Sequence, residues 1–182
     1  MFEELTKKNS KEFYRLYLAN KEAALADLFA DAAQDGISLD FSPDSLTALW
    51  QWAYPQFEYC SQHPVSDDIP IWYQPEYVNH PHFSGPPMTL KSIKIRDKLA
   101  YYFGEVLIRH IPNLHWELCE EKNSPYSNCP IINGATATYP LRVVGNVLSR
   151  AVKKSPHHSE DTLKEAFRMF KNEVETDTGY EP

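Results

Sequence analysis

The chain of 182 residues carries 18 Lys and Arg against 25 Asp and Glu, for a formal net charge of −7, and is 42% hydrophobic and 13% aromatic. This length is typical of one domain, and the composition argues against disorder. No apolar run approaches the roughly 18 residues that a membrane span requires, and the acidic balance disfavours nucleic acid as a partner. We therefore expect a single domain over residues 1–182 that binds neither membrane nor nucleic acid.

The first half of the chain predicts two helices. Helical spacing of apolar residues indicates a helix that is capped at Asn9-Ser10 and ends at Gly36. Residues 37–41 alternate apolar and polar, which indicates a short strand or an extended lead-in. Ser42 and Pro43 then suit the cap and first position of a helix that should stop at Pro55. Residues 58–88 hold six prolines and several aromatic rings, so we expect a long ordered loop.

The second half predicts three helices and two strands. Thr89 opens a helix that Pro112-Asn113 ends, and Gly104 within it either weakens the helix or marks close packing. Short strands are expected at 115–119 and 129–132, followed by a helix from Tyr139-Pro140 to Val152. The last helix follows Ser159, with Leu163, Phe167, Met169, Phe170 and Val174 as its apolar members, and the tail after residue 175 should fray. The sum is a helix-rich α+β domain with about five helices and a small sheet of two or three short strands.

The charges are unevenly distributed along the chain. From Glu22 to Leu90 there is no Lys or Arg but ten acids, so this stretch, hereafter the acidic segment, carries −10. The remaining 15 acids and 18 basic residues give +3. Such asymmetry concerns partners and association rates rather than the fold.

The sharpest local feature is a row of acids at i, i+4 and i+8, formed by Asp27, Asp31 and Asp35. Like charges at this spacing destabilise a helix, and these approach the negative end of its dipole. A broken local rule is typical of a functional surface. The row is either a solvated face, a surface for a partner, or, least favoured, part of a divalent metal site, because one helix spaces carboxylates poorly for an oxygen cage.

Aromatic residues in the acidic segment extend this surface, because Tyr and Trp act as anchors at interfaces. The alternative is that these rings pack in the core, as Trp usually does. The predicted partner-binding residues are Asp27, Asp31, Asp35, Asp67, Asp68, Trp72, Tyr73 and Glu76.

Few residues suggest enzyme chemistry. Glu105 and Arg109 are an i, i+4 pair close in sequence to Trp116, and they form either a pocket with an acid/base group and an anion contact or an ordinary helix ion pair. The chain has no nucleophile elbow and no Gly-rich phosphate loop. We predict no catalytic residue, no metal site and no cofactor. Three cysteines without a CxxC pair favour buried thiols in a reducing cytoplasm over a disulfide framework.

Three short motifs follow one another along the chain, at residues 39–46 (LDFSPDSL), 101–109 (YYFGEVLIR) and 115–117 (HWE). Their order resembles that of small uncharacterised bacterial proteins, some of them associated with toxin-immunity loci. The resemblance implies a single cytoplasmic domain and carries over no catalytic residue.

The sequence therefore favours a non-enzymatic binding protein, most concretely an immunity-like protein or inhibitor that neutralises a basic protein partner such as a toxin. Two alternatives stay open. One is a small enzyme with a pocket around Glu105, Arg109 and Trp116, and the other is a scaffold subunit that oligomerises through its last helix.

Overall fold

The computed structural model describes residues 7–62, 64, 68, 70, 87–152 and 159–177. Within these residues five α-helices and one short 3₁₀ helix surround a single hydrophobic core, with a two-stranded antiparallel sheet. The elements follow in the order α1 (Lys7–Gln34), α2 (Ser45–Ala53), η2 (Tyr54–Gln56), α4 (Leu90–His110), β1 (His115–Leu118), β2 (Pro130–Asn133), α5 (Pro140–Val152) and α6 (Thr162–Asp177). The predicted helix-rich α+β class is confirmed.

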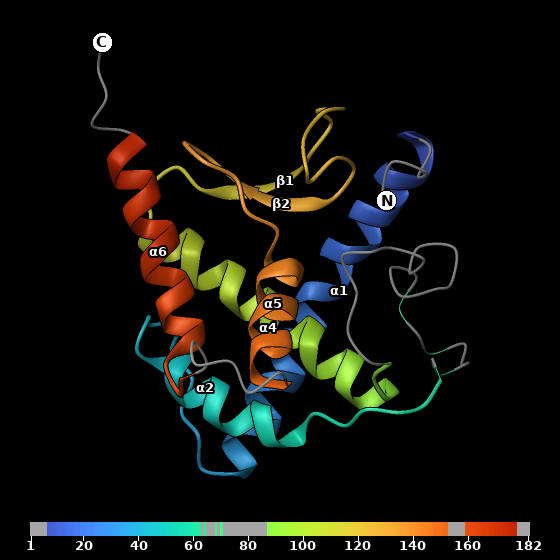
Figure 1. Ribbon diagram of the computed structural model, residues 1–182, viewed down its shortest axis with the longest axis vertical. Helices are drawn as coiled ribbons and strands as arrows, with labels where there is room; N and C mark the ends of the chain where they lie inside the picture. Colours follow the sequence, from blue (N-terminus) through green and yellow to red (C-terminus); the bar gives the residue numbers. More distant parts are fainter. Residues whose placement is uncertain are drawn as a thin grey trace.

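Helix α4 is the centre of the molecule. It runs through the middle of the bundle, with α5 in front of it and α1 behind it in the view of Figure 1, and it also contacts α2, α6 and β2. Thr89 caps it as predicted, because its hydroxyl oxygen accepts a hydrogen bond from the Ser92 N–H at 3.3 Å.

Most residues of α4 are buried, among them Leu99, Tyr101 and Tyr102. The exposed side chains of Lys91, Lys94 and Arg109 lie along one side of the helix. Helix α4 is therefore the element against which the other helices pack.

Helix α1 begins earlier than the sequence indicates. It starts at Lys7, so the cap predicted at Asn9-Ser10 is wrong, and Ser10 is instead a fully buried residue within the helix. Tertiary packing has overridden the local capping preference. The C-terminal end is as predicted: Gly36 has a φ of 75°, its N–H bonds to the Ala33 carbonyl at 3.1 Å, and the Ile37 N–H bonds to the Ala32 carbonyl at 2.9 Å. This is the Schellman arrangement, which favours glycine at the left-handed position.

The strand predicted at residues 37–41 is absent, and this segment is a loop. Its last residue, Phe41, has a φ of 60°, which no strand residue adopts. The Phe41 N–H donates to the Tyr102 hydroxyl at 2.7 Å, and its carbonyl lies 2.9 Å from His110 Nε2. The sequence alternates here because Leu39 is buried in the core while its neighbours are not. Side chains of α4, rather than a neighbouring strand, form the hydrogen bonds with the backbone of Phe41.

Helix α2 begins at Ser45, two residues later than Pro43 suggests. Ser42 still caps the turn, because its hydroxyl oxygen accepts the Ser45 N–H at 3.2 Å. The helix stops at Ala53, and Pro55 lies in the 3₁₀ turn that follows, as expected.

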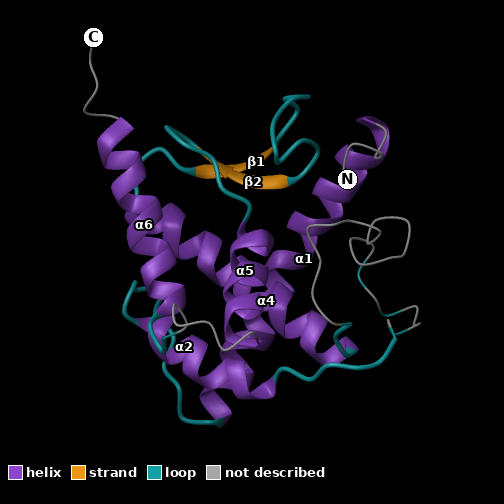
Figure 2. Cartoon of the chain, in the orientation of Figure 1, coloured by secondary structure: helices purple, strands orange, loops and turns teal. Residues whose placement is uncertain are grey.

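The sheet pairs His115 with Asn133 at one end and Leu118 with Pro130 at the other. Figure 2 shows it lying across one end of the helical bundle. Cys119 and Cys129, predicted as strand residues, lie one position beyond the strand ends.

Helices α5 and α6 begin as predicted. In α6, Leu163, Phe167, Phe170 and Val174 are buried within the chain, but Met169 is 61% exposed, so its assignment to the apolar face is wrong. The helix also continues to Asp177, past the point where fraying was expected. The apolar face on which the oligomeric alternative depends is thus used inside the chain.

The proline-rich loop predicted at 58–88 lies mostly outside the described residues. Its two ends are held together, because the Cys60 N–H donates to the Pro87 carbonyl at 2.8 Å and the Thr89 N–H donates to the Glu58 carbonyl at 3.1 Å.

Candidate partner-binding surface

The row of acids on α1 lies on the outside of the molecule. Asp27, Asp31 and Asp35 are all exposed, while Leu28 and Ala32 on the adjoining face of the helix are fully buried. The i, i+4 spacing therefore does place the three carboxylates along one solvent-facing stripe, as the periodicity predicts.

Two of these acids also serve the fold. Asp31 forms an ion pair with Lys98 of α4 at 2.7 Å, and Asp35 accepts a hydrogen bond from the Trp52 indole of α2 at 2.7 Å. Asp27 forms no ion pair or hydrogen bond with the described residues. The stripe thus ties α1 to two neighbouring helices and leaves Asp27 open to a partner.

The acidic segment as a whole faces solvent. All of its acids that the structure describes are exposed: Glu22, Asp27, Asp31, Asp35, Asp40, Asp44, Glu58 and Asp68. Four of them lie beside a lysine from outside the segment, in the pairs Glu22–Lys21, Asp31–Lys98, Glu58–Lys91 and Asp44–Lys164. Part of the negative charge is therefore balanced within the molecule. The local sequence does not show three of these pairs, because Lys91, Lys98 and Lys164 lie on other helices, far along the chain from their acids.

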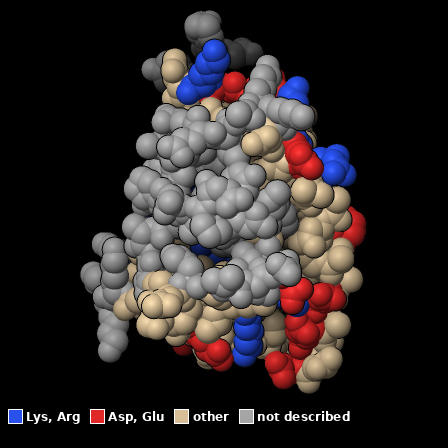
Figure 3. Space-filling view, turned by 90° about the vertical axis from the view of Figure 1, so that its right-hand side faces the viewer, with Lys and Arg blue, Asp and Glu red and all other residues tan. Residues whose placement is uncertain are grey.

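Four exposed carboxylates, of which only Asp31 is paired with a lysine in the described part of the chain, lie on the C-terminal half of α1 and in the loop that follows it. This group, hereafter the α1 acidic surface, consists of Asp27, Asp31, Asp35 and Asp40, and the last turn of α1 holds no basic residue against the negative end of its dipole. Hydrogen bonds from the Ser42 hydroxyl and N–H hold the pKa of Asp40 below its ordinary value. Figure 3 shows one side of the molecule, on which Asp and Glu side chains gather toward one edge of the described surface with Lys and Arg between them.

Most of the predicted partner-binding residues beyond α1 lie outside the part of the chain that the structure describes. Asp67, Trp72, Tyr73 and Glu76 lie outside the described residues, and Asp68 is exposed. The other two tryptophans of the acidic segment are not surface anchors: Trp50 is 1% exposed and belongs to the core, and Trp52 is half-buried.

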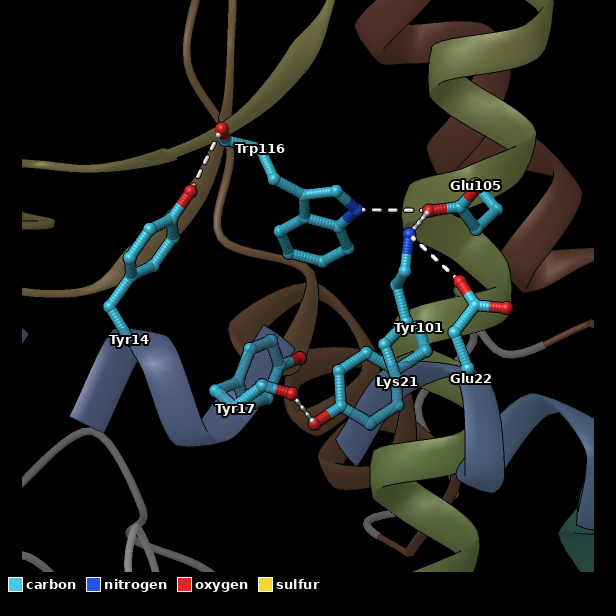
Figure 4. A network of polar contacts seen from close by, with 7 residues as sticks. All are labelled: Tyr14, Tyr17, Lys21, Glu22, Tyr101, Glu105 and Trp116. Atoms are coloured by element: carbon cyan, nitrogen blue, oxygen red, sulfur yellow. Dashed lines mark hydrogen bonds and ion pairs between the residues drawn. The ribbon is translucent and has the colours of Figure 1, made fainter. Parts of the chain in front are cut away.

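Glu105 and Trp116 are in contact, as expected for the predicted pocket, but Lys21 of α1 also contacts Glu105 (Figure 4). Glu105 Oε1 lies 2.7 Å from Lys21 Nζ and accepts the Trp116 indole N–H at 3.0 Å. The Tyr14 hydroxyl donates to the Trp116 carbonyl at 3.0 Å. Gly104 lies directly under the indole, where a Cβ would come within 2.4 Å of Trp116 Cζ2. These contacts bind α1, α4 and β1 to one another.

Arg109 does not join this group. It is exposed, and its guanidinium lies 3.7 Å from the centre of the Phe41 ring. It forms no ion pair with Glu105 in the described structure, so neither the pocket nor the helix ion pair is formed from these two side chains as expected. The stacked arginine is a cation–π contact between α4 and the loop that follows α1.

Comparison with known proteins finds no match for the chain among protein-family models, curated proteins or solved structures. Among the residues that the structure describes, no cluster of His, Cys, Asp and Glu is large enough to hold a metal ion. None of the helices in the described ranges has the length and apolar character needed to cross a bilayer.

Proposed function

We propose that the protein is a non-enzymatic binding protein that neutralises a basic protein partner, in the manner of an immunity protein or inhibitor, in the cytoplasm. The observation that carries the proposal is the stripe of exposed carboxylates on α1, which remains on the surface although Lys98 and Trp52 engage two of its members. Acidic surfaces steer cationic partners and raise the rate of association.

The α1 acidic surface suits this role because it is a fixed array. Asp31 and Asp35 are held by contacts to α4 and α2, so their carboxylates lose little freedom when a partner binds. Asp27 and Asp40 then supply charge that no lysine of the described chain pairs with.

The test is the rate at which a captured basic partner associates. Candidates are recovered from the native host with the wild-type protein as bait, and their association is measured at low and high salt. Asp27→Lys changes the surface without breaking an internal contact, and Glu173→Lys, an exposed acid of α6, makes the same change in net charge elsewhere.

We expect Asp27→Lys to slow association several-fold at low salt and Glu173→Lys to leave it nearly unchanged, with the difference vanishing at high salt. Equal rates for the two variants at low salt would show that the α1 acidic surface does not meet the partner. Reversal of Asp31 or Asp35 is a poorer test, because it also removes a contact of the fold.

A further inference from the structure

Cys119 and Cys129 lie opposite each other where β1 and β2 end. The ladder continues one position past the Leu118–Pro130 pair, because the Cys119 N–H donates to the Cys129 carbonyl at 3.0 Å. The Asn128 N–H donates to the Cys119 carbonyl at 2.7 Å, and Asn128 has a φ of 62°, which marks a bulge with one extra residue on this strand. Residues directly opposite in an antiparallel pair have Cα atoms about 4.5–5.5 Å apart. That spacing lies within the roughly 4.4–6.8 Å that a disulfide spans.

The two thiols share one side of the pair and one environment. Opposite residues of an antiparallel ladder point to the same face. Both are free thiols, with Cys119 7% and Cys129 3% exposed. Burial raises the pKa of Cys129, the neighbouring Cys119 thiol raises it further, and Arg142 acts in the opposite direction. The effect of Cys119 on the pKa of Cys129 agrees with the position of the two residues opposite each other in the ladder.

We propose that Cys119 and Cys129 form a redox-sensitive pair, which hydrogen peroxide oxidises to an intramolecular disulfide. The Cys119 sulfur, the more exposed of the two, attacks one peroxide oxygen; the O–O bond breaks, leaving Cys119 as a sulfenic acid and releasing water. The Cys129 sulfur then attacks the Cys119 sulfur and the S–OH bond breaks. The leaving hydroxide takes the Cys129 proton as a second water, so two thiols and one peroxide give one disulfide and two water molecules.

The disulfide would close the nine residues between the two cysteines into a covalent loop. It would also join the ends of β1 and β2, and β1 carries Trp116, whose indole packs on Gly104 of α4. Oxidation therefore fastens one end of the sheet, three residues along the chain from Trp116, through which the sheet is anchored to α4.

The experiment uses the full chain with Cys60→Ser, which leaves this pair as its only cysteines. The folded protein is treated with hydrogen peroxide, denatured, alkylated and analysed by mass spectrometry. We expect a mass lower by two hydrogens, no alkylated cysteine, one peptide link between positions 119 and 129, and reversal by dithiothreitol. The unfolding midpoint should rise by several degrees on oxidation and return on reduction.

A second measurement compares how much dithiothreitol is needed to reduce the disulfide in native buffer and in urea. If the fold holds the sulfurs together, the native disulfide should require more reductant. The proposal is overturned if both cysteines are alkylated after peroxide, if they end as separate sulfinic acids, or if the disulfide is reduced equally easily in native buffer and in urea.

Discussion

Replacement of Gly104 by alanine should destabilise the protein, although alanine is the better helix former. The added Cβ would lie 2.4 Å from Trp116 Cζ2, 2.9 Å from Trp116 Cη2 and 3.4 Å from Ile132 Cδ1. The indole must therefore move, and with it the N–H that donates to Glu105 at 3.0 Å.

The magnitude follows from three opposing effects. Overpacking of a well-filled site costs about 1–3 kcal/mol, and a weakened hydrogen bond to a carboxylate adds about 1 kcal/mol. Alanine returns about 0.5–1 kcal/mol of helix stability. We expect Gly104→Ala to lower the free energy of unfolding by about 1–3 kcal/mol, which for a chain of this size corresponds to a fall of about 3–10 °C in the midpoint temperature.

The assay is urea unfolding of a double-mutant cycle with Trp116→Phe. The phenylalanine ring lacks the outer atoms of the indole, so Gly104→Ala should cost little or stabilise slightly in that background. An equal cost in both backgrounds would refute the reasoning, because the penalty would then not arise from the contact with Trp116.

Three further predictions concern buried polar contacts and pH. Glu105→Gln should cost about 1–3 kcal/mol in urea unfolding, because it leaves Lys21, which is only 19% exposed, with the exposed Glu22 carboxylate at 3.7 Å as its remaining ion pair, whereas Glu22→Gln should change little. Tyr102→Phe should cost about 1–3 kcal/mol at neutral pH, because the half-buried Phe41 N–H and the buried Ser45 hydroxyl both lose a hydrogen-bond partner. Burial raises the pKa of Tyr102 above 10.0, so its contribution is complete below pH 10 and is lost as the pH rises through the higher folded value; thermal melts of Tyr102→Phe should therefore show a shallower alkaline decline. The hydrogen bond and charge of Lys164 lower the pKa of Asp44 below 3.8, so its contribution is lost as the pH falls below about 4, and Asp44→Asn should flatten the acid limb of the same profile.

Local chemistry was sufficient to predict most of the helices. Thr89 caps α4 and Gly36 ends α1 through contacts with residues three to five positions away, so the local sequence is enough to predict these helix ends. Gly104 also signalled a close contact, which the structure assigns to the Trp116 indole.

The errors occur where distant residues determine the outcome. The predicted strand at 37–41 is a loop because Tyr102 and His110, more than 60 residues away, bond to the backbone of Phe41. The start of α1 is wrong because Ser10 is buried by packing that no local rule describes.

The candidate site shows the same division. The helical period correctly placed Asp27, Asp31 and Asp35 on one exposed face. It did not reveal that Lys98, 67 residues further along the chain, pairs with Asp31. Charge counted along a sequence therefore overstates the charge that a folded surface offers.

The contacts between α1 and α4 have a consequence for synthesis on the ribosome. The Tyr17 carbonyl meets the Tyr101 hydroxyl, and Lys21 meets Glu105, across 84 residues of chain in each case. At about 5–20 residues per second, α1 waits on the order of 4–17 s after it is made before its partner helix exists. During that interval the side chains that are buried in the finished fold, among them Tyr17 and Leu28, lack the helix that completes their packing, so nascent α1 exposes apolar surface while the chain is still being made.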